Sequence, residues 1–206
     1  MRSANWCIQG IAAGLALAIS AGVSAAAFDD PDWPCIQRKV PELSIGQMWA
    51  GPIPEADAVA DAAVRSLAQR LSPRRVSVEE VGSEVAAAVQ ALGPDERAEE
   101  LSALFAAMLA RINVERGSII AGIGRYAHHQ AELADRIEAM QIELAALEAA
   151  PDDGKDWDRI EELTDTLAWE TRIFRDRAQS LTYVCESPVL LEQRAFAIGR
   201  VLAELL

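Results

Sequence analysis

Residues 144–167 read LAALEAAPDDGKDWDRIEELTDTL. The middle of this stretch, residues 151–154 (PDDG), is a turn signal, because Pro and Gly both interrupt helices and Asp favours turns. Apolar residues recur at helical spacing before and after it. A short turn between two such segments is typical of an antiparallel helical hairpin. This stretch therefore decides the fold class, which we predict to be all-α.

The two helices of the predicted hairpin share one spacing. Their apolar residues step by alternating threes and fours, the 3.5-residue repeat of a coiled coil. We therefore predict a coiled-coil hairpin over residues 96–182. The positions are Leu101, Phe105, Met108, Ile112, Leu133, Ile137, Met140, Leu144 and Leu147 before the turn, and Trp157, Ile160, Thr164, Leu167, Thr171, Phe174, Ala178 and Leu181 after it.

The turn also predicts which residues of the two helices face each other. If Leu147 faces Trp157, the partners count in opposite directions away from the turn. This register places Ile119 opposite about Cys185. Anything bonded to Cys185 must then lie at the base of the hairpin.

Further helices flank the hairpin. One is predicted over residues 55–71. Another begins at Ser77, where Ser77 and Glu80 have the spacing of a capping box, and ends near Leu92. Pro188 suits the first turn of a last helix that runs to residue 206. The prediction is a bundle of about five helices in a domain that spans residues 55–206.

An extended strap is expected to precede this domain. Residues 28–54 contain five prolines, which lack an amide donor and favour extended backbone in the residue before them. The segment also carries apolar side chains that would not stay in water, above all Trp33 and Trp49. We therefore expect the strap to pack on the bundle, anchored by these two tryptophans, which would lie over a glycine-rich stretch at the base of the hairpin.

The first 27 residues resemble a secretory signal peptide. Arg2 gives a positive start, an apolar run covers residues 8–23, and small residues follow at positions 24–27. These are the three parts of such a signal. We expect cleavage and export, for example to the periplasm. The alternative is an uncleaved signal that anchors the chain in the inner membrane.

Cysteine usage agrees with export. Cys7 would leave with the signal, so that Cys35 and Cys185 remain. An even pair in an exported chain indicates a disulfide. Combined with the hairpin register, this bond would place the strap near residues 113–122.

The net charge of the chain limits the classes of partner that it could bind. The chain carries 19 basic and 32 acidic residues, a net charge of −13. Such a surface repels nucleic acid and acidic lipid headgroups. We expect a protein partner or self-association through the hairpin, and no membrane contact after signal cleavage.

One helical stretch has an unusual composition. Residues 113–129 contain Gly117, Gly122 and Gly124, and each glycine costs a helix about 0.8 to 1 kcal/mol relative to Ala. Close packing of a neighbouring helix or of the strap would explain them. A kink or the floor of a pocket is the functional alternative.

Charged residues are predicted to gather at the same level of the hairpin. Ion pairs at such a junction usually fix the register of the helices. A pocket for a small anionic or zwitterionic ligand is the alternative. The candidates for this junction or ligand site are Arg38, Glu115, Arg116, Gly117, Gly122, Gly124, Arg125, Tyr126, Glu192 and Arg194.

No catalytic pattern is found in the sequence. It has no Gly-x-Ser-x-Gly elbow and no phosphate-binding glycine loop. The neighbouring histidines His128 and His129 point about 100° apart on a helix and cannot chelate one metal together. We expect no enzyme activity, no cofactor and no metal.

These observations favour an exported, non-catalytic helical scaffold or adaptor that uses its coiled-coil hairpin to bind protein. One alternative is a small helical periplasmic chaperone, although the Leu-Thr-x-x-Gln repeats of Spy-like chaperones are absent. Another is a ligand-sensing bundle with its site at the glycine-rich base of the hairpin.

Overall fold

The computed structural model describes residues 30, 32–55 and 60–206, and within this part the chain forms helices and no strand. The predicted all-α class is therefore confirmed. The expected signal peptide lies outside the described residues. No helix in the described part is long and apolar enough to cross a membrane.

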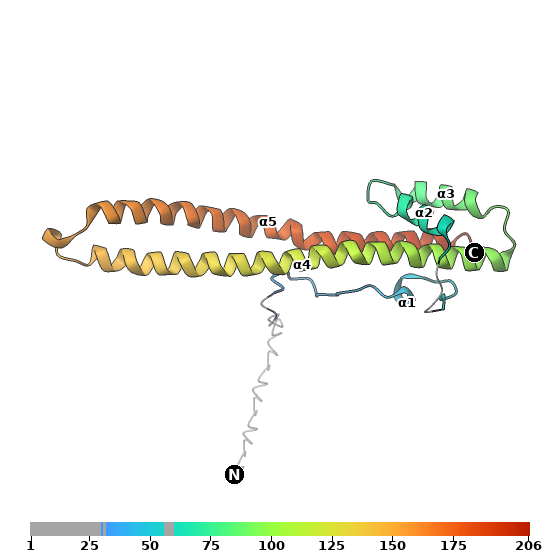
Figure 1. Cartoon of the computed structure of the whole chain (residues 1–206), viewed down its shortest axis with the longest axis horizontal. Helices are drawn as coiled ribbons and strands as arrows, with labels where there is room; N and C mark the ends of the chain where they lie inside the picture. The colour runs from blue at the N-terminus through green and yellow to red at the C-terminus, as the bar shows by residue number, and fades with distance from the viewer. Residues whose placement is uncertain (1–29, 31, 56–59) are drawn as a thin grey trace, which may run out of the picture.

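Two long helices form the antiparallel hairpin (Figure 1). They are α4 (Pro94–Glu148) and α5 (Trp157–Ala203), and the 3₁₀ turn η1 (Asp152–Gly154) lies between them. The predicted register is confirmed by two hydrogen bonds across the pair. The side-chain amide of Gln130 donates to the carbonyl of Phe174 at 3.2 Å, and Arg116 Nε donates to the carbonyl of Pro188 at 3.1 Å.

The prediction of a separate last helix was wrong, because α5 continues through Pro188. A proline inside a helix removes one hydrogen bond and costs about 3 kcal/mol. The helix is held on both sides of it, since Cys185 and Leu191 are both buried. Tertiary packing therefore overrides the local signal at Pro188.

Two short helices pack beside the hairpin: α2 (Ala62–Leu71) and α3 (Val78–Val89). Helix α2 is shorter than predicted, because Asp61 caps it by accepting from the amide of Val64. Of the predicted capping box, the structure has the bond from the amide of Glu80 to Ser77 Oγ, at 3.0 Å. Helix α3 ends at Val89, before the predicted Leu92.

The strap crosses the hairpin on the side away from α2 and α3 (Figure 1). It is extended up to the one-turn helix α1 (Ile45–Met48). The strap runs against the direction of α4: Asp32 lies at Gly124, Leu43 at Asn113, and Trp49 at Phe105. An extended chain along a helix fits the prediction.

The buried core lies in one half of the hairpin. The main cluster joins α2, α3 and the strap to the ends of α4 and α5 that lie far from the turn, and a small second cluster surrounds the disulfide. Beyond it, residues 125–178 form a two-helix extension that we call the distal arm (Figure 1). The fold thus consists of a projecting arm and a packed half that we call the base. The base comprises the strap, α2, α3 and the parts of α4 and α5 outside residues 125–178.

In the distal arm, α4 keeps its predicted seam positions, whereas α5 departs from several of those predicted for it. Leu133 and Leu163 are buried along the seam between the helices, whereas Trp157 and Thr164 are exposed. Helix α5 is therefore rotated so that some predicted core positions lie on the outside. Trp157 and Thr164 therefore belong to the surface of the arm.

Candidate functional site

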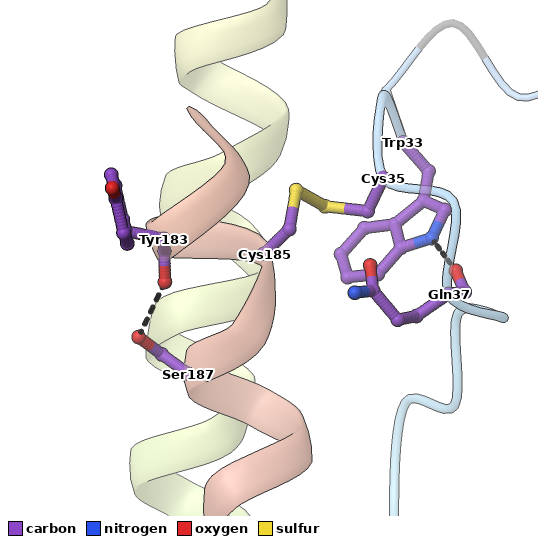
Figure 2. Close-up of a disulfide and its surroundings, with 6 residues drawn as sticks. All are labelled: Trp33, Cys35, Gln37, Tyr183, Cys185 and Ser187. Carbon is purple, nitrogen blue, oxygen red and sulfur yellow. Dashed lines mark hydrogen bonds between the residues drawn. A yellow bond between two sulfur atoms is a disulfide. The ribbon is translucent and has the colours of Figure 1, made fainter. Parts of the chain in front are cut away.

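The disulfide joins the strap to α5 (Figure 2). Cys35 and Cys185 have Cα atoms 5.6 Å apart and are both buried. Trp33 lies beside the bond, and its indole N–H donates to the carbonyl of Gln37 at 2.6 Å. Ile123 of α4 completes this small cluster. The predicted bond is confirmed, and Trp33 is buried beside it.

Two side-chain contacts hold the start of the strap. Lys39 Nζ lies 2.7 Å from a carboxylate oxygen of Asp30, which lowers the pKa of that carboxyl through the hydrogen bond with Lys39. His128 Nε2 lies 2.6 Å from Asp32 Oδ1. His128 thus contacts the strap, whereas His129 contacts Glu132 on its own helix at 3.2 Å.

Asn113 fixes the middle of the strap. Its side-chain oxygen accepts from the amide of Leu43 at 3.0 Å, and its side-chain NH₂ donates to the carbonyl of the same residue at 2.9 Å. One side chain therefore satisfies both backbone groups of a buried strap residue. Asn113 is not among the predicted site residues, although an Asn directly after Ile112 on an apolar helix face is a usable signal.

Replacing Asn113 is expected to loosen the strap. Asn113→Ala leaves the amide and carbonyl of Leu43 without these partners, and such a loss costs about 1 to 3 kcal/mol. Chemical unfolding should show this decrease. Val114→Ala is the control, because Val114 is 76% exposed, and it should change stability by less than about 0.5 kcal/mol. Equal effects of the two variants would contradict the assignment.

Trp49 lies farther along the base than predicted. Its ring stacks on Phe105 with centroids 5.1 Å apart, about two helical turns beyond Asn113. The expectation that it covers the glycine-rich stretch was therefore wrong, because the extended strap carries it past that stretch. The strap also approaches the backbone of α5 closely at Gly199, where an added Cβ would collide with the carbonyl oxygen of Met48.

The three glycines of α4 differ in their surroundings. A Cβ on Gly124 would lie 3.4 Å from the backbone oxygen of Asp32, so this glycine packs against the strap as expected. A Cβ on Gly117 would meet no atom within 4 Å, and one on Gly122 would meet only the end of Arg125 at 3.7 Å. Close packing therefore explains one glycine of the three, and α4 is continuous through all of them.

Arg116 is a buried charge between the two long helices. It is 2% exposed, its Nε donates to Pro188, and its Nη2 lies 3.8 Å from Glu192. Burial lowers the pKa of the guanidinium, and the charge of Glu192 opposes this shift. Its Nη1 has no hydrogen-bond partner in the described part. The pair joins the two long helices, and the cost of removing the Arg116 charge from water offsets much of the attraction between the two charges.

Arg194 caps the C-terminal end of α2. Its guanidinium donates to the carbonyls of Leu71, Ser72 and Pro73 at 2.9 to 3.1 Å. These are helix-end carbonyls, which need donors and favour a positive charge. Burial and the charge of Arg74 lower the pKa of Arg194. This candidate is therefore a tie between α5 and α2.

The remaining candidates do not gather at one place. Arg38, Glu115 and Arg125 are exposed, and Glu192 serves as the partner of Arg116. Tyr126 lines a cavity of about 490 Å³ together with His129, Gln130, Glu132, Arg136 and Arg177. Its hydroxyl has no hydrogen-bond partner in the described part, and burial raises its pKa.

A larger cavity, of about 1080 Å³, lies between α2, α3 and α4. Alanines form much of its lining, and carboxylates stand at its edge, among them Glu100 and Asp61. Burial, then the charge of Asp61, raises the pKa of Glu100. A third cavity, of about 500 Å³, lies between the strap and α4.

The raised pKa of Glu100 predicts a pH effect. Because ionisation costs more in the folded chain than in the unfolded chain, stability is lost as the pH rises through the ordinary glutamate range near about 4.3. Glu100→Gln should therefore be more stable than the wild type at pH 7, and the difference should vanish at lower pH. Thermal unfolding at several pH values measures it. Glu99→Gln, at an exposed neighbour, is the control, and an equal gain there would contradict the cause given.

No group of three or more His, Cys, Asp or Glu side chains that could hold a metal occurs among the described residues. Comparison with protein-family models, with curated proteins and with solved structures finds no match. The function must therefore be argued from the geometry alone.

Proposed function

We propose that the chain is an exported helical scaffold or adaptor without catalysis, and that it binds protein through the distal arm of a coiled-coil hairpin. The observation that carries this proposal is the difference in burial along the hairpin. In the base, Leu101 and Met108 are fully buried. In the arm, most seam residues at the same spacing are only half-buried: Ile137, Met140, Leu144, Leu147, Ile160, Leu167 and Phe174.

Two helices alone cannot surround their seam, so apolar area remains in contact with water. Additional helices on the arm would bury it, at about 25 cal/mol per Å² of apolar surface. Exposed side chains on the arm add to this area, because Trp169 is 62% and Ile142 is 66% exposed. Apolar side chains exposed along one element are typical of a protein interaction site.

Export is supported by the disulfide. A bond between residues 35 and 185 persists in an oxidising compartment and is rare in the cytosol. Intact-mass measurement of the protein from fractionated cells tests this part. We expect a chain that begins near residue 28 in the soluble exported fraction. The full-length mass in the membrane fraction would instead support the anchored alternative.

Site-specific photo-cross-linking tests the arm. A photoreactive residue at Ile142 should cross-link to a discrete protein in the exported fraction. The matched control is Val114, an exposed aliphatic residue on the same helix in the base, which should give no such product. Cross-links from position 114 alone, or from neither position, would contradict the proposal.

A ligand-sensing bundle is the second candidate. It is favoured by the cavity at Tyr126, where the tyrosine hydroxyl and the side-chain oxygen of Gln130 both lack partners in the described part. Arg177 lines the same cavity, so a small carboxylate is the ligand class to test. Such a compound should raise the melting temperature of the wild type by linkage, and should fail to do so in Arg177→Gln.

A further inference from the structure

The two flanks of the distal arm differ in chemistry. On one flank, ion pairs join the two helices: Arg159 lies 2.8 Å from Glu143, and Arg136 lies 3.7 Å from Glu170. Glu143 and Arg136 are seven residues apart, so they share this side of α4. We call it the paired flank.

The opposite flank is nearly free of charge. From Ala127 to Gln141 on α4 and from Thr164 to Ala178 on α5, seven-residue steps line it with small or uncharged residues, which meet across the seam in the observed register. The next step beyond Gln141 is Glu148, close to the tip of the arm. We call it the uncharged flank, and its residues are Ala127, Ala134 and Gln141 of α4 and Thr164, Thr171 and Ala178 of α5. Flanking positions of coiled coils usually carry charges, so this composition requires an explanation. Small side chains allow another helix pair to approach closely.

Charge is also divided along the length of the arm. Its outer part, residues 138–170, has eleven carboxylates against two basic residues, Lys155 and Arg159. Its inner part, residues 125–136 and 172–177, has five arginines against three carboxylates. The tip is therefore strongly negative, and the root is weakly positive.

A second copy of this chain complements both features. If two arms lie antiparallel with their uncharged flanks in contact, the negative tip of each lies beside the positive root of the other. The axis of symmetry then passes near Thr164 and Thr171, where the flank is small and uncharged. Trp157 and Arg175, which are five helical turns apart on this same flank, come level with each other across the interface.

We propose that the chain forms a symmetric dimer in which two distal arms pack antiparallel through the uncharged flank as a four-helix bundle. This rests on the proposed function and names its partner. The contact is isologous, so each arm meets the same surface of the other. The contact is about 33 Å long, for 22 helical residues, and about 20 Å wide, for two helices. Counted on both partners, it buries about 1,300 Å² in total, which is within the range of stable interfaces.

Analytical ultracentrifugation of the oxidised full-length mature chain tests the dimer. The wild type should sediment as a dimer at tens of micromolar, and the dimer should weaken as salt is raised, because charges contribute. Thr164→Glu places a charge at the axis and should give a monomer. Thr166→Glu makes the same change two residues away on the paired flank, at a position that is also exposed, and should leave the dimer intact.

Engineered cysteines test the orientation. Ala168→Cys, near the axis, should form a disulfide-linked dimer on oxidation, and Gly154→Cys, at the tip, should not. A linked dimer through position 154 would indicate a parallel arrangement and would overturn the proposal.

The remaining outcomes separate the two proposals. A wild type that is monomeric at 100 micromolar overturns the dimer. If cross-linking at Ile142 still captures a discrete protein, the adaptor function stands with a different partner. A dimer that survives both Thr164→Glu and Thr166→Glu is formed elsewhere on the chain, and it overturns the inference.

Discussion

Removal of the Cys35–Cys185 bond is expected to lower the free energy of unfolding by about 4 to 5 kcal/mol, because it closes a loop of about 150 residues in the unfolded chain. Cys35→Ser/Cys185→Ser removes the bond, and both positions are buried beside Trp33 and Ile123. Urea unfolding of this variant and of the oxidised wild type measures the difference.

The two serine substitutions also place hydroxyl groups at buried positions, which could lower stability by themselves. Reduced wild type lacks the bond and these hydroxyls, so it is the control. Reduced wild type and the double variant should have similar midpoints, both well below that of the oxidised protein. A difference of less than about 1 kcal/mol would mean that the bond does not constrain the unfolded chain as the entropy model requires. Free thiols in the native oxidised protein would contradict the bond itself.

Gly199→Ala is expected to destabilise the base by about 3 kcal/mol, at the upper end of the range for overpacked cores. The added Cβ would meet the backbone oxygen of Met48, and it would lie 3.2 Å from the ring of Phe105. Backbone cannot move aside as a flexible side chain can, so α1 must shift and the stacking of Trp49 on Phe105 is disturbed. Loss of near-ultraviolet circular dichroism from Trp49 should accompany the lower stability.

Gly117→Ala is the matched control, because it makes the same substitution in the middle of a long helix. There the new Cβ meets nothing within 4 Å, and helix propensity should stabilise the chain by about 0.8 to 1 kcal/mol. The two glycines should therefore change stability in opposite directions. A destabilising Gly117→Ala would indicate a contact at that position, and a neutral Gly199→Ala would contradict the packing of α1.

The hairpin could be predicted because its signals are local. The turn at residues 151–154 and the repeats around it are sufficient to set the register, and the bond between Gln130 and Phe174 agrees with that register. The disulfide followed from the count of cysteines and the apparent signal peptide. Continuity of α5 through Pro188 could not be predicted, because packing on both sides of the proline decides it.

The base was harder to predict than the hairpin. Sequence identifies glycines that weaken a helix, but it does not show which of them faces a neighbour. Gly199 lies in an ordinary apolar run and carries the tightest contact of α1, whereas Gly117 stands out in the sequence and faces open space. Of the candidate residues, Arg116 and Glu192 do come together, because the register of the hairpin places them at nearly the same level of α4 and α5.

Hydrogen–deuterium exchange along a dilution series tests the central claim most directly: the base provides stability, and the arm binds a second copy of the chain. In the oxidised mature chain, amides of the base at residues 101–112 should be strongly protected at every concentration. Amides of the arm at residues 134–148 and 157–171 should gain protection as concentration rises through the dimer range. Arm protection that stays constant over that range, or a change confined to the base, would contradict the account.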